Sequence, residues 1–280
     1  MKKWTGLLLV FGWVFCIVLD AQADILVLVH GYLSDASTWE SSGITTQLEQ
    51  NQWHRADVLI TTPMGVRRMP IPRPTGAPGA VSGNTVYLAE LPSTAPLGIQ
   101  ADHLQAMLLF LANQHPKEKI ILVGHSVGGV VARLVLVRTP IPNVSTLITI
   151  ASPHLGTPLA EEALDATSNI WPVEVVKDFF GGDEYQTLKY SRGLYIDIVR
   201  PWPGSLLHWL NNQPHPAVRY ISIVRSQPFV LWGDMLVPGA SQDMNNVPPL
   251  SGKSTLYTTT SGHILNPGDG LLLTQILKGL

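Results

Sequence analysis

Hydrophobic residues recur along this chain in short unbroken runs, and the longer stretches between the runs repeat their apolar positions with helical spacing. The runs are rich in Val, Ile and Leu, which is typical of strands that are buried on both faces of a parallel sheet. They occupy residues 24–32, 57–62, 85–91, 120–123, 144–151, 218–224 and 254–260. The pattern therefore predicts a central, mostly parallel sheet.

The stretches between these runs predict the helices. Helical spacing is found over residues 34–50, over 97–113, from Val130 onward and over 268–277. Alternation of strands and helices is typical of βαβ units, in which the carboxyl ends of the parallel strands form one edge where ligands bind. We therefore expect an α/β fold with helices on both faces of the sheet and a site at that edge.

Two segments interrupt this rhythm. Residues 64–79 are too rich in Pro and Gly for a regular element, so we interpret them as a surface loop near the site, either a substrate-facing flap or a plain insertion. Residues 159–217 contain amphipathic pieces around 171–180 and 203–210, which predict a helical insertion. For any single aromatic residue of this insertion, packing is the expected role. These aromatic residues include Trp171, Phe179, Phe180, Trp202 and Trp209.

The strongest local motif follows the run at 120–123. Gly124, Ser126 and Gly128 fit the pattern G-x-S-x-G between a predicted strand and a predicted helix. Such a tight turn strains its central residue and needs glycine where neighbouring chain approaches closely. The strain lifts the Ser126 hydroxyl clear of the sheet, beside amides at a helix start that stabilise an anion. We therefore predict that Ser126 is a nucleophile, since the glycine and lysine patterns of phosphate-binding turns are absent.

The amino terminus differs from the rest of the chain. Two lysines precede an apolar run over residues 4–19, and Ala21-Gln22-Ala23 supplies the small residues of a cleavage site. This arrangement predicts a secretory signal peptide over residues 1–23 and export to the periplasm or the medium. A retained membrane anchor fits less well because the run is short and contains glycine, and a lipoprotein signal fits less well because Cys16 lies deep within the run.

Composition narrows the remaining chemistry. Residues 24–280 are long enough for one domain with a full core, and they contain no cysteine, which excludes disulfides and a thiol nucleophile from the mature chain. A formal net charge of −2 provides no electrostatic reason to expect a nucleic-acid partner. The histidines and carboxylates do not cluster at metal-ligand spacing, so we expect neither a metal nor a cofactor.

Several motifs together resemble the α/β-hydrolase fold, and specifically its lipase and esterase branch. The first run ends in His30-Gly31-Tyr32, the turn around Ser126 reads Gly-His-Ser-Val-Gly, and residues 152–157 read Ser-Pro-His-Leu-Gly-Thr. The resemblance implies an oxyanion hole formed by the backbone amides of Tyr32 and Val127, and a helical cap or lid inserted at about 159–217. The resemblance does not predict which strand forms the edge of the sheet, because two opening strands of larger family members have no counterpart here.

The same resemblance implies the remaining catalytic residues. The loop around Asp234 is similar to the family's acidic loop, which makes Asp234 the expected acid and Asp243 the second choice. His263 follows the last predicted strand and is the expected base, so Ser126, Asp234 and His263 occur in the family's order of nucleophile, acid and base. Two further histidines near these motifs are assigned to loop structure, namely His30 and His154.

Together these features predict an exported serine hydrolase that cleaves carboxylic esters through an acyl-enzyme, with an acyl-ester or lipid as substrate. The cap would contact lipid surfaces transiently. An acyltransferase or thioesterase with the same three residues is an alternative, since only the acceptor of the acyl group differs, and peptidase activity is another. A binding protein without catalysis is the alternative from a different class, because a fold alone does not determine function. The sequence sets neither acyl-chain length nor head group.

Overall fold

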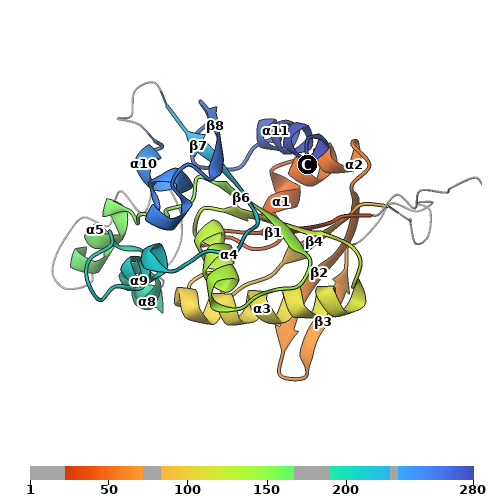
Figure 1. The fold of residues 1–280 in the computed structure, drawn as a ribbon, viewed down its shortest axis with the longest axis horizontal. Helices are drawn as coiled ribbons and strands as arrows, with labels where there is room; N and C mark the ends of the chain where they lie inside the picture. Colours follow the sequence, from red (N-terminus) through yellow and green to blue (C-terminus); the bar gives the residue numbers. More distant parts are fainter. Residues whose placement is uncertain (1–22, 72–82, 167–189, 228–232) are drawn as a thin grey trace, which may run out of the picture.

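The computed structural model describes residues 23–71, 83–166, 190–227 and 233–280. In this part of the chain, eight strands form one sheet in the order β3-β2-β4-β1-β5-β6-β7-β8 (Figure 1). The strands are β1 (Ile25–Val29), β2 (His54–Thr62), β3 (Gly65–Pro70), β4 (Thr85–Ala89), β5 (Ile120–His125), β6 (Val144–Ile150), β7 (Arg219–Arg225) and β8 (Ser254–Thr259). All neighbours pair in parallel except β2 and β3, so the prediction of a mostly parallel α/β sheet is confirmed.

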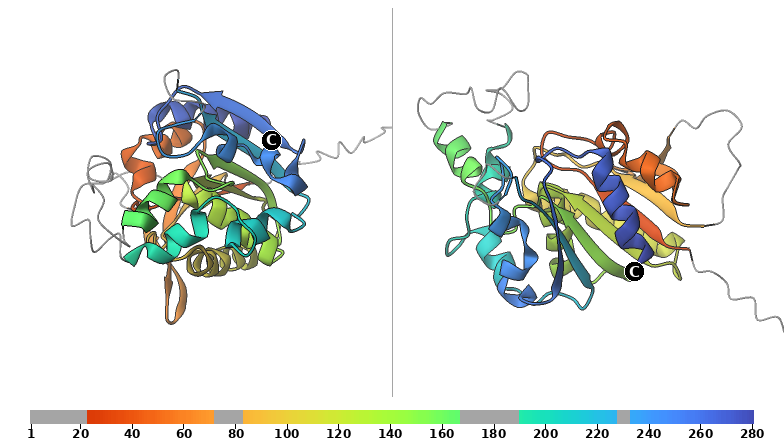
Figure 2. Two further views of the ribbon diagram at one scale, coloured as in Figure 1. Left: turned by 90° about the vertical axis from the view of Figure 1, so that its left-hand side faces the viewer. Right: turned by 90° about the horizontal axis from the view of Figure 1, so that it is seen from above.

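Helices cover both faces of this sheet, as the alternating pattern predicts (Figure 2). They are α1 (Thr38–Ser41), α2 (Ile44–Glu49), α3 (Leu97–Gln114), α4 (Val127–Arg138), α5 (Pro158–Ala166), α8 (Arg192–Ile198), α9 (Leu206–Asn212), α10 (Gly239–Gln242) and α11 (Pro267–Lys278), with 3₁₀ turns η1 (Met244–Asn246) and η2 (Pro248–Leu250). The side chains of β1 alternate between two cores, because Val27 packs with α3 and α4 whereas Leu26 and Leu28 pack with α1, α2 and α11. A strand that is apolar on both faces therefore lies at the centre of three layers.

The prediction of one continuous helix over residues 34–50 is wrong. The structure has two short helices there, α1 and α2, which are separated at Gly43. Gly43 adopts a left-handed backbone with φ of 77°, a conformation that ends a right-handed helix and that glycine tolerates without a Cβ penalty. The turn lets α2 pack against α11, a contact that helical spacing alone does not reveal.

The prediction that residues 64–79 contain no regular element is wrong for residues 65–70. These residues form β3, which pairs antiparallel with β2 after a turn at residues 63–64, and Gly65 at the start of β3 has φ of 106°. Five of the six residues of β3 are exposed, so the strand lacks the apolar pattern by which the buried strands are recognised. The β2–β3 hairpin projects from the molecule in Figure 1 and forms the sheet edge that the resemblance leaves open. Residues 72–79 of the predicted loop lie outside the described residues.

The parallel strands end at one common edge, and the predicted site residues follow them there. Tyr32 comes after β1, Ser126 directly after β5, Asp234 after β7 and His263 after β8. Within the predicted cap at 159–217, the described residues form most of α5 together with α8 and α9, which lie beside this edge in Figure 1. The amphipathic piece predicted at 171–180 lies outside the described residues.

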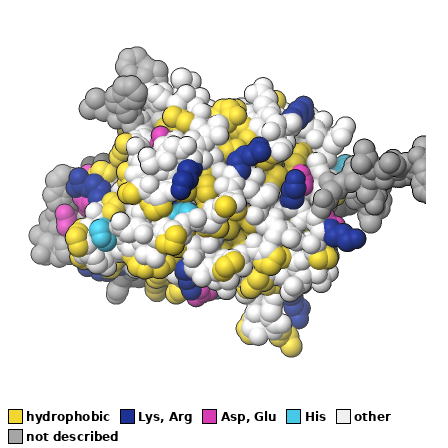
Figure 3. All heavy atoms as spheres, in the orientation of Figure 1, with side chains coloured by type: hydrophobic (Ala, Val, Ile, Leu, Met, Phe, Trp, Pro, Cys, Tyr) yellow, Lys and Arg dark blue, Asp and Glu magenta, His cyan; other side chains and the backbone are white. Residues whose placement is uncertain are grey.

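Two aromatic residues of this insertion differ from the packing role that we expect for them. Trp202 is 54% exposed and Trp209 is 42% exposed. On the face drawn in Figure 3, Lys and Arg side chains lie scattered among hydrophobic and uncharged ones. None of the helices in the described ranges is long and apolar enough to cross a membrane. The predicted signal peptide lies outside these ranges except for Ala23, so it stays a prediction.

Candidate active site

Ser126 lies in the turn between β5 and α4, as the G-x-S-x-G pattern predicts. Its backbone is strained, with φ of 52° and ψ of −129°. A Cβ atom at Gly124 would lie 2.4 Å from the Gly129 backbone, and one at Gly128 would lie 2.3 Å from the carbonyl oxygen of His30. Because real Cβ atoms do not approach other atoms so closely, glycine is sterically required at both positions.

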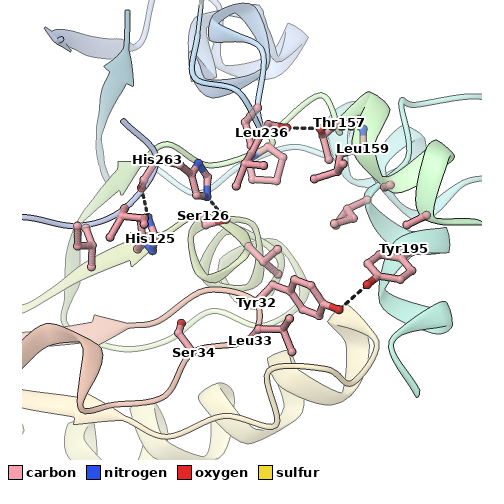
Figure 4. Close-up of a pocket in the computed structure, with 18 of the residues that line it drawn as sticks. Tyr32, Leu33, Ser34, His125, Ser126, Thr157, Leu159, Tyr195, Leu236 and His263 are labelled. Atoms are coloured by element: carbon pink, nitrogen blue, oxygen red, sulfur yellow. Dashed lines mark hydrogen bonds between the residues drawn. The ribbon is translucent and has the colours of Figure 1, made fainter. Parts of the chain in front are cut away.

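The structure brings the side chains of Ser126, His263 and Asp234 into one hydrogen-bonded chain. His263 Nε2 lies 2.9 Å from Ser126 Oγ (Figure 4), and His263 Nδ1 lies 2.8 Å from Asp234 Oδ2. With the proton on Nδ1, the imidazole donates to the carboxylate while Nε2 accepts from the serine hydroxyl. Ser126 and His263 are 137 positions apart in the chain, so the end points of β5 and β8 create this contact.

The Asp234 carboxylate is fully buried and has a hydrogen-bond donor at each side. Its Oδ1 atom accepts from the backbone amides of Leu236 and Val237 at 2.9 and 2.7 Å. Its Oδ2 atom accepts from Gln242 Nε2 at 3.2 Å as well as from His263. These donors hold the carboxylate in one orientation toward the imidazole. The sequence pattern does not single out Gln242, because a glutamine eight positions after the aspartate carries no motif.

Asp243, the second choice for the acid, lies elsewhere. Its Oδ1 atom accepts from the backbone amide of Asn245 at 2.9 Å and from Asn245 Nδ2 at 3.0 Å. It thereby caps the 3₁₀ turn η1. The structure therefore favours Asp234 over Asp243 as the partner of His263.

His30 and His154 lie in loops, as the sequence analysis assigns them. The buried His30 ring accepts from the Leu91 amide through Nε2 at 3.0 Å, which leaves the proton on Nδ1, 3.1 Å from the Gly31 carbonyl oxygen. Burial lowers the pKa of His30. His154 is fully buried, its Nε2 atom lies 3.1 Å from Thr149 Oγ1, and burial holds its pKa well below the usual value. Neither ring is a hydrogen-bond partner of Ser126, whose hydroxyl pairs with His263 instead.

His125 is a residue of the site that the sequence analysis does not single out. Its Nε2 atom lies 2.9 Å from the backbone carbonyl oxygen of His263, to which it donates. Burial, together with the nearby His263, holds the pKa of His125 well below its usual value, so the ring is neutral. His125 occupies a variable position of G-x-S-x-G, and for this reason the pattern attaches no role to it.

A pocket of about 230 Å³ opens beside Ser126 (Figure 4). Both residues expected to form the oxyanion hole, Tyr32 and Val127, line it. Val127 is the first residue of α4, so its amide has no acceptor within the helix. The rest of the wall is largely apolar and includes Leu159, Ala160, Ala163, Ile198, Leu236 and Val237.

This arrangement places a serine hydroxyl, an imidazole and a buried carboxylate in one hydrogen-bonded chain beside a pocket. Within the described ranges, no group of three or more His, Cys, Asp or Glu side chains is arranged to hold a metal ion. The arrangement can transfer a proton from Ser126 to His263 while Asp234 stabilises the charged ring. An apolar group bound in the pocket would lie beside the serine hydroxyl.

Sequence comparison relates part of the chain to deacylases. The family model described as PGAP1-like alpha/beta domain matches residues 100–177, which include the turn around Ser126. A GPI inositol-deacylase of Coccidioides immitis is 27% identical over 154 residues, which are 54% of this chain and 11% of that protein. A GPI inositol-deacylase of Debaryomyces hansenii is 41% identical over 68 residues, which are 21% of this chain and 6% of that protein. The matches thus span a small part of these relatives.

Structural comparison covers nearly the whole chain. The crystal structure of the Bacillus licheniformis lipase BlEst2 in mature form has a TM-score of 0.61 and 17% sequence identity, over 92% of this chain and 93% of the other. At this level of identity the likeness shows a shared fold. The chain therefore has the α/β-hydrolase fold that its motifs resemble.

Proposed function

We propose that this protein is a serine hydrolase that cleaves carboxylic esters through an acyl-enzyme. The observation that carries the proposal is the hydrogen-bonded chain from Asp234 through His263 to Ser126 beside a largely apolar pocket. The match to a PGAP1-like domain and the likeness to a lipase structure support it. In this proposal Ser126 is the nucleophile, His263 the general base and Asp234 the acid.

The reaction follows from the positions of these groups. His263 Nε2 takes the Ser126 proton as Oγ attacks the ester carbonyl, and Asp234 stabilises the resulting imidazolium. The amides of Tyr32 and Val127 would bind the oxyanion, and each such donor is typically worth about 3–4 kcal/mol of barrier. The imidazolium then returns the proton to the leaving alcohol. Water attacks the acyl-enzyme with His263 again as base and releases the acid and the free serine.

The walls of the pocket favour an apolar acyl group on the substrate. Side chains of α5 and α8, including Ala160, Ala163 and Ile198, surround the space beside Ser126. We therefore propose acyl esters or lipids as substrates, with the exposed Trp202 and Trp209 as contacts to lipid surfaces. The signal peptide predicted over residues 1–23 leads us to propose export to the periplasm or the medium.

The test is hydrolysis of p-nitrophenyl esters of increasing acyl length by the chain without residues 1–23. We expect turnover in the wild type and loss of at least about 10³-fold in Ser126→Ala, because the nucleophile is removed. Ser145→Ala removes a serine hydroxyl from β6, away from the pocket, and should keep full activity. A folded wild type that turns over no ester, and whose Ser126 is not labelled by a fluorophosphonate, would contradict the proposal.

The sequence matches favour a narrower candidate of the same class. Both relatives described above are named GPI inositol-deacylases. This similarity suggests an esterase that releases an acyl chain from a polyol such as inositol. The test compares kcat/KM for an acylated inositol with that for an alkyl ester of the same acyl chain. Equal values would count against the polyol head group, and product analysis with an added alcohol acceptor separates hydrolysis from acyl transfer.

A further inference from the structure

Three hydroxyl groups join the loop after β1 to helix α8. The Tyr32 hydroxyl donates to Ser191 Oγ at 3.0 Å and forms a short hydrogen bond with the Tyr195 hydroxyl (Figure 4). The two tyrosine rings meet edge to face, with their centroids 5.6 Å apart. Ser191 is fully buried and Tyr195 is 5% exposed. The outer end of the Tyr32 side chain is therefore held by α8, which belongs to the predicted cap.

The loop that contains Tyr32 is strained and needs such support. Leu33 has a left-handed backbone with φ of 51°, which costs a residue with a side chain about 1–2 kcal/mol. Strain of this kind persists only where surrounding contacts hold it. Before Tyr32, the Leu91 amide holds His30, and after Leu33, Ser34 Oγ donates to the Gly31 carbonyl oxygen at 3.0 Å. Tyr195 and Ser191 contribute support from the side of the cap.

The same loop packs directly against the nucleophile. A Cβ atom placed on Gly31 would lie 2.9 Å from Ser126 Cβ and 3.2 Å from the His125 carbonyl oxygen. A small shift of the loop would therefore move the Tyr32 amide relative to Ser126. Because an oxyanion donor acts only at about 2.7–3.1 Å from the developing charge, such a shift would weaken it strongly.

Helix α8 provides a firm support for this loop. The Asp197 carboxylate accepts from the Leu97 amide at 2.8 Å and so ties α8 to the start of α3. Gly193 packs so closely on Pro96 that an added Cβ would lie 2.7 Å from Pro96 Cγ. At the end of α8, the Ile198 carbonyl oxygen accepts from the Thr157 amide at 3.0 Å.

We propose that Tyr195 is a positioning residue that holds the Tyr32 loop, through the Tyr32 hydroxyl, where the Tyr32 amide reaches the oxyanion at Ser126. This inference rests on the proposed function, because it needs an oxyanion at Ser126. Burial raises the pKa of both tyrosines, so both hydroxyls keep their protons near neutral pH. The oxyanion exists only along the reaction path, and for this reason loosening the loop lowers kcat while KM stays nearly constant.

The experiment compares Tyr195→Phe with Tyr220→Phe. The first variant keeps the ring and removes one oxygen from the cluster, whereas the second removes a hydroxyl that donates to the Pro216 carbonyl oxygen at 2.9 Å, away from the pocket. We measure kcat and KM for a p-nitrophenyl ester, and the affinity for an alkylboronic acid, whose serine adduct carries an oxyanion-like oxygen. Tyr195→Phe should lower kcat and boronate affinity about tenfold each and keep KM within twofold. Removing an oxyanion donor typically lowers kcat about 10²–10³-fold, and a donor that is only displaced should cost part of that. Tyr220→Phe should change neither.

A double variant tests the route through Tyr32. If Tyr195 acts through the hydroxyl of Tyr32, Tyr32→Phe with Tyr195→Phe should lose no more kcat than Tyr32→Phe alone. If Tyr195→Phe does not fold by near-UV circular dichroism, Ser191→Ala weakens the same cluster while keeping both tyrosines, and about a threefold loss of kcat is expected.

Two results would overturn the inference and leave the proposed function intact. The first is that the wild type is active and Tyr195→Phe keeps kcat and boronate affinity within twofold of it. If Tyr195→Phe does not fold, unchanged kcat and boronate affinity in Ser191→Ala count in the same way. The other is a rise in KM alone, which would mean substrate contact. A wild type without turnover and without fluorophosphonate labelling of Ser126 would overturn the proposed function itself, and this inference with it.

Discussion

The loops that carry Asp234 and His263 meet the loop that carries Tyr32 at Ser126, but different contacts hold the two sides. On the side of the acid and the histidine, Arg225 and Asp269 form a buried ion pair with Nη1–Oδ1 and Nη2–Oδ2 distances of 2.6 and 2.8 Å. On the Tyr32 side, neutral hydroxyl groups from α8 hold a strained backbone. Buried charge thus supports one side, and a few neutral hydrogen bonds support the other.

The ion pair reaches both ends of the His263 loop. Arg225 Nη1 also donates to Thr259 Oγ1 at 2.8 Å, at the end of β8. Asp269 Oδ2 accepts from the Asn266 amide at 3.0 Å, just before α11. The Arg225 amide in turn donates to Gln242 Oε1 at 2.7 Å, and Gln242 also holds Asp234. One buried pair therefore connects the histidine loop with the acid loop.

The movement of charge in the proposed reaction gives a reason for the difference between the two sides. In the proposed reaction, His263 becomes charged while Asp234 stays ionised, so their mutual orientation must not change as charge moves. A bidentate arginine–carboxylate pair provides strong and directional support for this purpose. The Tyr32 side supplies a neutral donor and connects to the predicted cap. We expect changes on the charged side to have larger effects than changes on the Tyr32 side.

The largest loss of kcat is expected for Asp234→Asn. The amide nitrogen would face the donors Gln242 Nε2 and His263 Nδ1, so the imidazole would be driven into the wrong tautomer. We expect kcat to fall about 10⁴-fold with little change in fold. Steady-state ester hydrolysis near pH 8 measures this, and near-UV circular dichroism checks the fold. A loss below tenfold would mean that Asp234 does not orient His263.

Arg225→Met tests the charged support itself. The variant leaves the Asp269 carboxylate buried without its cation, which should lower the free energy of unfolding by about 3–5 kcal/mol. Urea denaturation at pH 7 measures the loss. Arg138→Met, which breaks the exposed pair with Asp102, is the control and should cost less than about 1 kcal/mol. Equal losses in both variants would mean that the buried pair supports the His263 side no more than an exposed surface pair would.

Gly31→Ala tests the Tyr32 side by placing a methyl group between the Tyr32 loop and Ser126. The added Cβ would meet Ser126 Cβ at 2.9 Å, so the loop must move away from the nucleophile by a few tenths of an ångström. We expect kcat to fall about 10- to 100-fold, since oxyanion donors depend sharply on distance. Gly98→Ala, where an added Cβ meets no atom within 4 Å, serves as the control and should leave kcat unchanged. An unchanged kcat in Gly31→Ala would show that the loop position does not matter.

The smallest effect per residue concerns pH, through His30 behind the Tyr32 loop, His125 behind the His263 loop and the buried His154. Burial lowers the pKa of each ring in the folded chain, whereas the unfolded chain titrates near 6.5. Below about pH 6.5 the unfolded chain binds protons that the folded chain does not, so stability is complete above this pH and falls below it. Each ring contributes at most about 1.4 kcal/mol per pH unit.

Urea midpoints at pH 7.5, 6.5 and 5.5 measure this dependence. We expect similar midpoints at the two higher values and a clear decrease at pH 5.5. His30→Gln and His125→Gln, compared with the wild type, show which side of the pocket contributes more of the decrease. A midpoint that is the same at pH 7.5 and pH 5.5 would contradict the interpretation that these rings are buried in neutral form.

The parts of the site that could be predicted from the sequence are those with a local cause. Gly124, Ser126 and Gly128 lie within five positions, and the strand before them and the helix after them are both visible as apolar patterns. Asp234 and His263 could be predicted because the loop around Asp234 and the order of the two residues after Ser126 resemble the α/β-hydrolase family, and because His263 follows the last predicted strand. The sequence pattern does not predict the exposed strand β3 or the turn at Gly43, because neither produces a periodic pattern of apolar residues.

By itself, the sequence determined the α/β class, the strained turn at Ser126 and the set of strand ends at which the site residues lie, because these depend on local periodicity and on glycine sterics. Only the tertiary structure decided which of two aspartates meets His263, that His125 and Gln242 hold the two loops, and that Tyr195 reaches Tyr32. Such contacts depend on the relative placement of loops that are distant in the chain, and this placement results from packing across the whole sheet.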